Sequence, residues 1–415
     1  MITTFELVYE VIMFVAIYIQ VFFLLVFFEH RQKISPKIPT ISLTDTEKLS
    51  VSFLLPCWNE GATVLGTVES ILGLDYPKEK LHIIIIDDGS TDNTPQVLKV
   101  YEGHPQVTLL RKENGGKYTA LNYALPFVKT DLVVSFDADT TIEPQALHKA
   151  IPYFVKDHEL MALGGTVLIG NPKTFVQKAQ EIEYQTFSFT KKMLGLIGAV
   201  LVVPGAFAIF RRGVFDKVGG YKHAYLLEDG EMTMRLHSHG MKIDHCHEAI
   251  VRTKGPDTIK KLFKQRLRWS YGFIRNMVDY RHMFVNKKYR DFGLFTLPAG
   301  VFAYVLLVFV FSYSIYKVTV ATIASIHKIM LVGWEGFTFG TWDLFYFDTK
   351  ATTLMSLFIY TAIIAGFLLG RYISRITHKN FHNIPYFIVV YGYVAPLWVI
   401  RSIYDWLFSR TVTWR

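Results

Sequence analysis

Two acidic pairs in the sequence carry side chains that could hold a metal ion or move a proton. Asp137 and Asp139 stand two residues apart in FDADT. Their hard carboxylate oxygens suit Mg²⁺ or Mn²⁺, an ion whose remaining ligands are commonly phosphate oxygens of a substrate. Glu228 and Asp229 are adjacent in LLEDGEMTMRL, where one of them could act as a general base for a hydroxyl group. Each pair alone also fits a structural interpretation, as a polar turn or as acids that complement a helix dipole.

A third acidic pair and a glycine-containing segment could contact a nucleotide. IDDGSTDNT places Asp87 and Asp88 at the end of an apolar run, where carboxylates could accept hydrogen bonds from a base or a ribose. In ENGGKYTALN a Gly-Gly pair precedes Lys117 and a helical segment. Backbone N–H groups and a lysine can hold a diphosphate. The alternatives are that Asp92 and Asn93 of the first motif only cap a helix and that the glycines form an ordinary loop.

The segment KQRLRWSYG lies shortly before a long apolar run that begins at residue 292. On a helix, Gln265, Arg268 and Trp269 stand at i, i+3 and i+4, so they share one face. Arginine offers a planar set of donors for phosphate, and tryptophan offers an amphipathic plate for a sugar ring or for the membrane interface. The alternative is an amphipathic helix that only lies on the membrane. Both interpretations can hold, because such a helix has two faces.

Short apolar runs alternate with helical segments between about residues 50 and 256. VSFLLP, LHIIIIDDG and DLVVSFDAD are rich in Val, Ile and Phe and end in polar or turn residues, which predicts buried strands of a mostly parallel sheet. EGATVLGTVESILGL and NTPQVLKVYEG have helical spacing, so the order predicts βαβ units of a Rossmann-like α/β fold. Ligands of such sheets bind beyond the carboxyl ends of the strands. The residues that fall at these ends are Asp87, Asp88, Asp137 and Asp139.

The composition of the chain indicates a membrane protein. Of its 415 residues 51% are hydrophobic and 15% are aromatic, and the mean hydropathy of +0.26 is too high for an ordinary soluble enzyme. The formal net charge of +9 fits cytoplasmic flanks of spans, attraction to anionic lipid, or an anionic substrate. No nucleic-acid partner is predicted, because no basic tail or nucleic-acid motif is present. Cys57 and Cys246 are too few for a disulfide framework or a usual zinc site.

Apolar runs predict where the chain enters the lipid bilayer. Residues 11–28 are long enough to span it, and the basic segment after them places the chain beyond about residue 29 in the cytoplasm. Residues 292–316 and 352–370 are further spans. Residues 384–408 contain Pro396, Arg401 and Asp405, so they could cross once, dip in and return, or lie partly on the surface. Residues 317–350 are ambiguous.

Six short motifs occur together in an order that is typical of one enzyme family. PCWNE, IDDGSTDNT, GGK, DAD, ED and QRLRW follow one another between residues 51 and 272. This set resembles the membrane-embedded family 2 glycosyltransferases that have a GT-A catalytic domain. Within the family the chain is most similar to poly-N-acetylglucosamine synthases, whereas hyaluronan, chitin and cellulose synthases are more distant. One departure is Leu227, where many relatives have Thr before the Glu-Asp pair.

The resemblance implies a nucleotide and metal site at the edge of the sheet. The residues that would line the nucleotide pocket are Pro56, Asn59 and Glu60, with Asp87 or Asp88 at the uracil and Lys117 at the diphosphate. Asp137 and Asp139 would hold the nucleotide and Mg²⁺ or Mn²⁺, with Asp139 as the closer metal ligand.

The resemblance also implies an acceptor site beside the donor. Asp229, next to Glu228, would be the base that deprotonates the acceptor hydroxyl. Gln265, Arg268 and Trp269 would close over the acceptor and the diphosphate. VPGAF, residues 203–207, falls where the family has an acceptor-side loop.

The reaction that the resemblance implies is inverting transfer of a sugar, N-acetylglucosamine first among candidates, from a UDP-sugar to a growing β-linked polysaccharide. Transfer would be processive and coupled to export through the adjoining spans. The main alternative is non-processive transfer to a membrane lipid. A non-catalytic receptor with a degenerate transferase domain is a further alternative, against which the intact acids argue. The expected partners are the UDP-sugar, a polysaccharide or lipid acceptor and the lipid bilayer, and a small membrane partner subunit stays open.

These observations divide the chain into five parts. The expected parts are an N-terminal transmembrane helix (residues 1–29), a cytoplasmic linker (30–49), a GT-A catalytic domain (50–257), interfacial helices with Q-x-x-R-W (258–291) and a C-terminal transmembrane region (292–415). The expected location is the plasma membrane, with several spans and a cytoplasmic catalytic domain.

Overall fold

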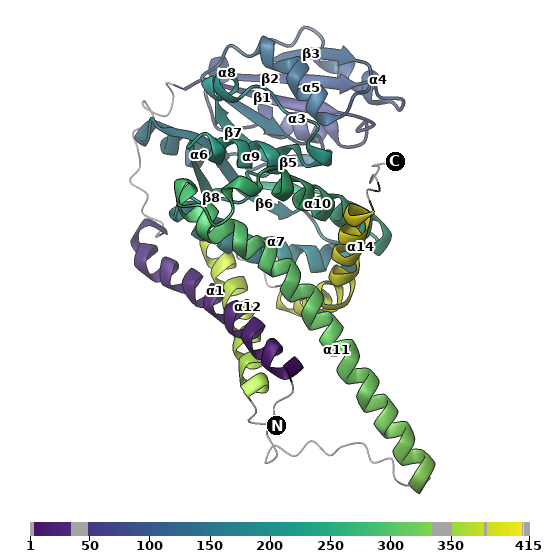
Figure 1. The fold of residues 1–415 in the computed structure, drawn as a ribbon. Coiled ribbons are helices and arrows are strands. Elements are labelled where there is room, and N and C mark those ends of the chain that lie inside the picture. Colours follow the sequence, from purple (N-terminus) through teal and green to yellow (C-terminus); the bar gives the residue numbers. More distant parts are fainter. Residues whose placement is uncertain (1–3, 35–48, 334–350, 377–379, 409, 411–415) are drawn as a thin grey trace.

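The computed structural model describes residues 4–34, 49–333, 351–376, 380–408 and 410. An eight-stranded sheet forms the upper part of the molecule in Figure 1. The strands are β1 (Val51–Cys57), β2 (Leu81–Asp88), β3 (Val107–Lys112), β4 (Leu132–Phe136), β5 (Thr140–Ile142), β6 (Leu160–Ile169), β7 (Phe207–Arg211) and β8 (Lys242–Thr253). Their spatial order is β3-β2-β1-β4-β7-β6-β8-β5.

The first half of the sheet is parallel and has the βαβ order that the sequence predicts. β1 pairs in parallel with both β2 and β4, and β2 with β3. Apart from half-buried His82, every residue of β2 is buried, as expected for a strand covered on both faces. The carboxyl ends of β1, β2 and β4 therefore meet at one edge, which confirms the α/β fold. β7 runs antiparallel between β4 and β6, so the sheet as a whole is mixed.

Helices cover both faces of the sheet. The α-helices are α1 (Thr4–Ile34), α3 (Val64–Leu72), α4 (Thr94–Leu98), α5 (Lys117–Ala124), α6 (Ala146–Lys156), α7 (Phe175–Leu196), α8 (Gly213–Val218), α9 (Glu228–Ser238), α10 (Ile259–Asp279), α11 (Leu297–Val332), α12 (Ala351–Ile373), α13 (Ile384–Val389) and α14 (Ala395–Leu407). Apolar side chains of α3 and α6 share one core cluster with β1, and those of α5 and α9 share a second cluster with the alternate residues of β1 and β2.

Short 3₁₀ and π turns connect these elements. The 3₁₀ turns are η1 (Lys78–Lys80), η2 (Lys99–Tyr101), η3 (Leu125–Phe127), η4 (Ala224–Leu226), η5 (Arg281–Met283), η6 (Lys287–Tyr289) and η10 (Phe381–Asn383), and the π turns are η7 (Phe292–Thr296) and η11 (Val390–Val394). The π turn η11 separates α13 from α14 within one apolar segment.

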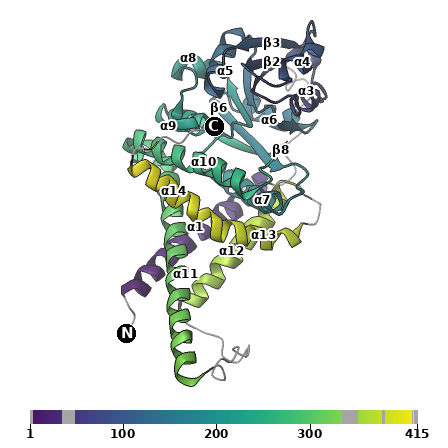
Figure 2. The same ribbon diagram turned by 90° about the vertical axis from the view of Figure 1, so that its right-hand side faces the viewer.

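A second layer of long helices lies beneath the sheet domain. α7 begins with a capping box, in which the Thr174 hydroxyl accepts from the Gln177 N–H and the Gln177 side chain accepts from the Thr174 N–H. α7 packs against α1 and α12 through one apolar cluster, and against α10 and α14 through another. Figure 2 shows α14 lying along the underside of α10 and α13 lying beneath α7, while α1, α11 and α12 extend away from the sheet.

Among the described residues, four segments are long and apolar enough to cross a membrane. They are Leu7–Gln32, Phe292–Val332, Thr353–Ile373 and Phe381–Leu407. The first two contain the predicted spans 11–28 and 292–316, and the third overlaps all but the first residue of the predicted span 352–370. The ambiguous stretch after residue 316 continues α11 as far as Val332, and residues 334–350 lie outside the described part, as does most of the expected linker. The fourth segment is broken by η11, and its path relative to the bilayer stays a prediction.

Candidate active site

A cavity of about 1460 Å³ opens beyond the carboxyl ends of the strands and continues between the long helices. It brings together all but one of the residues that the sequence singles out. Those that line it are Pro56, Asn59, Glu60, Asp88, Lys117, Asp137, Asp139, Glu228, Asp229, Gln265, Arg268 and Trp269. Asp87 does not line this cavity. Successive residues of a strand point to opposite faces of a sheet, so only one of two adjacent acids can face it.

Asp88 is held at the end of β2 by a set of donors. Its carboxylate accepts hydrogen bonds from the Lys112 ammonium group at 2.7 Å and from the Gly115 and Gly116 N–H groups at 3.1 and 2.8 Å. The sequence suggested that these glycine N–H groups hold a diphosphate, but the structure differs, because Asp88 already occupies them. Asp87 instead accepts from the Ser90 N–H at 2.9 Å.

Lys117 is the first residue of α5, directly after Gly116, whose φ of +91° suits glycine. Its ammonium nitrogen lies 2.5 Å from Asp137 Oδ1 and 3.3 Å from Glu228 Oε1. Burial alone would lower the pKa of Lys117, but Asp137, Glu228 and Asp229 together raise it above its ordinary value. The lysine therefore stays protonated, and its ammonium group links the end of strand β4 to the start of α9.

Asp137 and Asp139 follow β4, as the sequence predicts. The Asp139 carboxylate accepts from the hydroxyl groups of Thr140 and Thr253, each at 3.3 Å. Burial, and then the nearby charges of Asp137 and Glu60, raise the pKa of Asp139 to about 7. A buried group of carboxylates is stabilised by a hard cation, so these residues fit Mg²⁺ or Mn²⁺. Within the described residues, no group of three or more His, Cys, Asp or Glu side chains surrounds a common metal position.

Asp229 lies in the first turn of α9 and faces the same cavity. Its carboxylate accepts from the Gly205 N–H at 3.0 Å and from its neighbour's N–H, that of Gly230, at 2.8 Å. Burial, followed by the charge of Glu228, raises the pKa of Asp229, while Lys117 opposes this shift. The raised pKa makes the carboxylate a stronger proton acceptor than an exposed aspartate.

Gly205 explains part of the role of VPGAF. A Cβ atom at this position would lie 3.0 Å from Lys117 Nζ and 3.3 Å from Asp229 Oδ2. The absence of a side chain thus allows the backbone to approach both functional groups closely. The sequence placed this loop beside the acceptor but did not identify its contact with Asp229.

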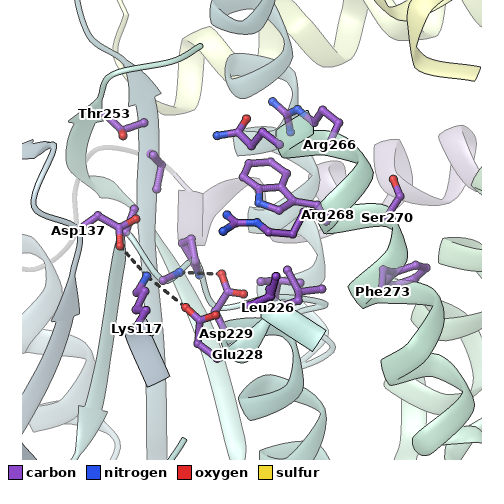
Figure 3. Close-up of a pocket in the computed structure, with 18 of the residues that line it drawn as sticks. Lys117, Asp137, Leu226, Glu228, Asp229, Thr253, Arg266, Arg268, Ser270 and Phe273 are labelled. Atoms are coloured by element: carbon purple, nitrogen blue, oxygen red, sulfur yellow. Dashed lines mark hydrogen bonds and ion pairs between the residues drawn. The ribbon is translucent and has the colours of Figure 1, made fainter. Parts of the chain in front are cut away.

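The Q-x-x-R-W residues lie on α10, opposite the carboxylates. Figure 3 shows Lys117 and Arg268 approaching the Glu228–Asp229 pair from different sides. Burial lowers the pKa of Arg268, while Glu228 and Asp229 act in the opposite sense. The Trp269 ring is stacked against the guanidinium of Arg266, 4.2 Å from its carbon. Gln265, Arg268 and Trp269 therefore reach one cavity, as their helical spacing predicts.

The sequence-based search missed several residues on the membrane side of the cavity. Glu183 and Lys191 of α7, Arg266 of α10 and Tyr391 of η11 also line it. Arg266 lies inside the Q-x-x-R-W motif, whereas Glu183 stands in a helix of mixed polar and apolar residues, where no local signal distinguishes it. Apolar and aromatic side chains complete this end, namely Phe273, Tyr304, Leu307, Trp398 and Val399.

Comparison with known proteins agrees with this arrangement. The model of the family described as Glycosyltransferase like family 2 matches residues 49–272. Poly-beta-1,6-N-acetyl-D-glucosamine synthase of Staphylococcus aureus strain COL is 34% identical over 263 residues, which cover 63% of this chain and 62% of that protein. The synthase of the same name from Staphylococcus epidermidis is 29% identical over 355 residues, covering 85% of this chain and 81% of that protein.

One solved structure shares the fold over nearly the whole chain. The mannosyltransferase PcManGT from Pyrobaculum calidifontis, in complex with GDP-Man and Mn²⁺, aligns with a TM-score of 0.62 and 17% identity, over 97% of this chain and 99% of that one. At this identity the likeness concerns the fold, which is the GT-A type with attached apolar helices. Since the family model covers more than half of the chain, the protein belongs to glycosyltransferase family 2.

Proposed function

We propose that this protein transfers N-acetylglucosamine from UDP-N-acetylglucosamine to the end of a growing β-linked polysaccharide at the cytoplasmic face of the membrane. The observation that carries the proposal is the continuous cavity, which joins the charged strand ends to the space between α7, α10, α11 and α14. The names of the Staphylococcus relatives support the sugar and the polymeric product. The apolar helices adjoining the cavity support a product that leaves through the membrane.

The donor site neutralises the diphosphate of the sugar nucleotide. Lys117 and Arg268 supply positive charge in a partly buried site, where such charge stabilises a leaving phosphate more strongly than in water. Asp137 and Asp139 would hold Mg²⁺ or Mn²⁺, which would supply further positive charge to the diphosphate. Asp88 sits at the end of β2 in a position suited to the nucleoside, with its own orientation fixed by Lys112 and the two glycines.

Asp229 would be the base in a single displacement. The acceptor hydroxyl oxygen forms a bond to the anomeric carbon as its proton passes to the Asp229 carboxylate. The bond between the anomeric carbon and the diphosphate oxygen breaks, and its electron pair leaves with UDP. Attack from the face opposite to UDP inverts an α-linked donor into a β-linked product. The Gly205 and Gly230 N–H groups orient the carboxylate for this step.

A direct test is to incubate the purified, detergent-solubilised protein with a panel of UDP-sugars and Mg²⁺ or Mn²⁺ and to size the product. We expect long polymer from UDP-N-acetylglucosamine, sensitivity of that polymer to β-specific hydrolases, and loss of transfer on chelation of the metal. If the products at saturating donor carried a single added sugar and no polymer formed, this result would contradict a processive synthase.

A lipid acceptor is the second candidate. The apolar and aromatic side chains at the membrane end of the cavity, such as Phe273, Leu307 and Trp398, favour it because they could contact an acyl chain. Extraction of the same reaction with organic solvent separates the two candidates. Labelled sugar in the organic phase would support the lipid acceptor, whereas label retained in an insoluble or aqueous polymer would support the polysaccharide.

A further inference from the structure

Beneath the indole of Trp269 lies a buried ion pair that the proposed reaction does not use. Arg266 Nη2 of α10 contacts Glu183 Oε2 of α7 at 2.7 Å, and each of the two side chains is only 6% exposed. The hydroxyl of Tyr391, in the π turn η11, donates to the same Glu183 oxygen. Three elements that are far apart in the sequence thus converge on one carboxylate oxygen.

The ion pair fixes the guanidinium against which Trp269 stacks. The Arg266 carbon lies 4.2 Å from the centre of the Trp269 ring and 5.8 Å from that of Tyr184. A cation held at this distance restricts the tilt of the indole, because the attraction depends on the position of the charge over the ring face. The contacts that fix the position of Arg266 therefore also restrict the orientation of Trp269, which lines the cavity.

The third member of the cluster connects this site to the C-terminal helices. Tyr391 lies outside residues 49–272, which the family model covers. Its ring also packs against that of Trp398 in α14, with centroids 6.0 Å apart at an angle of 82°. A π turn inside an otherwise α-helical segment is uncommon and is frequent at functional sites. In this segment it accompanies the tyrosine whose hydroxyl donates to Glu183.

We propose that Glu183, Arg266 and Tyr391 form a positioning cluster that sets the orientation of Trp269, and through it the seating of the acceptor sugar. The inference rests on the proposed function in that the acceptor is a saccharide. Arg266 is a positioning residue, since it acts through Trp269. The cluster makes the C-terminal segment part of the acceptor site, although the transferase motifs all lie before residue 272.

The primary variant is Tyr391→Phe, because it keeps the ring and the ion pair and removes only the hydroxyl that orients Glu183. With an N-acetylglucosamine oligosaccharide as acceptor, we expect KM for the acceptor to rise about three- to tenfold, while kcat changes less than twofold. Glu183→Gln should act in the same direction and more strongly, because it leaves a buried guanidinium without its counter-charge. The melting temperature of each variant is measured alongside.

Two matched controls separate this effect from general loosening. Tyr393→Phe changes a tyrosine of the same π turn that is 65% exposed, and its acceptor KM should equal that of the wild type. Glu181→Gln removes a buried charge of α7 that accepts from Asn383 at 2.8 Å, so it should lower the melting temperature without raising the acceptor KM. If both controls raise KM as much as Tyr391→Phe, the cluster has only a structural role.

The decisive measurement is a double-mutant cycle with Trp269→Ala. If the cluster acts through the indole, adding Tyr391→Phe or Glu183→Gln to Trp269→Ala should change the acceptor KM by less than about 1.5-fold. Effects that multiply would overturn the inference. Failure of the wild type to bind or elongate any N-acetylglucosamine oligosaccharide would overturn the proposed function together with this inference. If the wild type elongates the oligosaccharide normally but the substitutions in the cluster and at Trp269 raise the acceptor KM independently, this inference is wrong and the proposed function stands.

Discussion

The donor end of the cavity and its membrane-side end differ in how their charges are compensated. At the donor end, the side chains of Lys117 and Asp137 are 30% and 34% exposed. The lysine forms ion pairs with two acids, Asp137 and Glu228. At the membrane-side end, Arg266 and Glu183 are each 6% exposed and contact each other directly. An accessible pair can exchange partners with an incoming ion, whereas a buried pair resists separation. The first arrangement suits the binding of a charged ligand, and the second suits the maintenance of a shape.

Asp229 lies where the two ends meet, and its replacement should have the largest effect. Asp229→Asn keeps the size of the side chain but removes the proposed proton acceptor, so we expect transfer to fall roughly 10²- to 10⁴-fold. UDP binding, measured by calorimetry, should change little. Glu228→Gln is the matched control and should retain more transfer activity. Near wild-type transfer by Asp229→Asn would place the base elsewhere.

The raised pKa of Asp229 also gives the wild type a pH dependence. The carboxylate must be deprotonated to act as a base, so transfer should decline as the pH falls through a value above that of an ordinary aspartate. Initial rates between pH 4 and pH 8 at saturating donor measure this decline. A rate that stays constant down to pH 4 would contradict the assignment.

Lys117 tests whether the donor end works through exchangeable charge. Lys117→Met removes the cation next to Asp137 and Glu228, and loss of one electrostatic contact to a developing charge costs roughly 10²- to 10³-fold in kcat. We expect weaker UDP binding as well, measured by calorimetry. Lys112→Met is an informative comparison, because that lysine contacts Asp88 and should affect nucleotide binding more than kcat. If both variants lowered kcat and weakened UDP binding to the same extent, the two lysines would not have different roles.

Trp269 tests the membrane-side end. Trp269→Ala removes the indole from the cavity while leaving the Glu183–Arg266 pair in place, so the acceptor KM should rise about tenfold. The dissociation constant of UDP should stay within twofold of the wild-type value. If the variant lost UDP binding and kept its acceptor KM, the two ends of the cavity would not have the separate roles described above.

His237 gives a prediction about the stability of the fold, not about the rate of transfer. It lies in α9, its Nε2–H donates to the Val200 carbonyl at 2.9 Å, and its ring stacks on that of Phe292 with centroids 3.7 Å apart. Burial lowers its pKa from about 6.5 to about 4, so the folded protein favours neutral His237. The unfolded chain binds the proton more tightly, so stability is full above about pH 6.5 and decreases as the pH falls toward 4.

The displacement of the His237 pKa corresponds to about 3 kcal/mol. Melting temperatures of the wild type and of His237→Gln, recorded between pH 4 and pH 7.5, measure this contribution. The wild type should lose stability on acidification more steeply than the variant. Parallel curves would show that His237 does not connect α9 to the membrane segment in the way described.

The sequence predicts the donor end better than the membrane-side end for a physical reason. Asp137 and Asp139 are adjacent to a strand end, so local pattern and sheet topology place them together. The choice between Asp87 and Asp88 depends on which face of β2 meets the cavity, and an apolar run buried on both faces does not reveal it. Contacts such as that between Glu183 and Tyr391 join residues 208 positions apart, and no local periodicity encodes them.

Gly205 has a consequence for how freely this protein can change. A single missing Cβ leaves room both for the ammonium group that would steady the leaving UDP and for the carboxylate that would activate the acceptor. Any substitution at this position would disturb departure and attack together. Gly205 should therefore tolerate substitution less than its neighbours do. In a saturation scan of residues 203–207, transfer activity should be lowest for substitutions at Gly205.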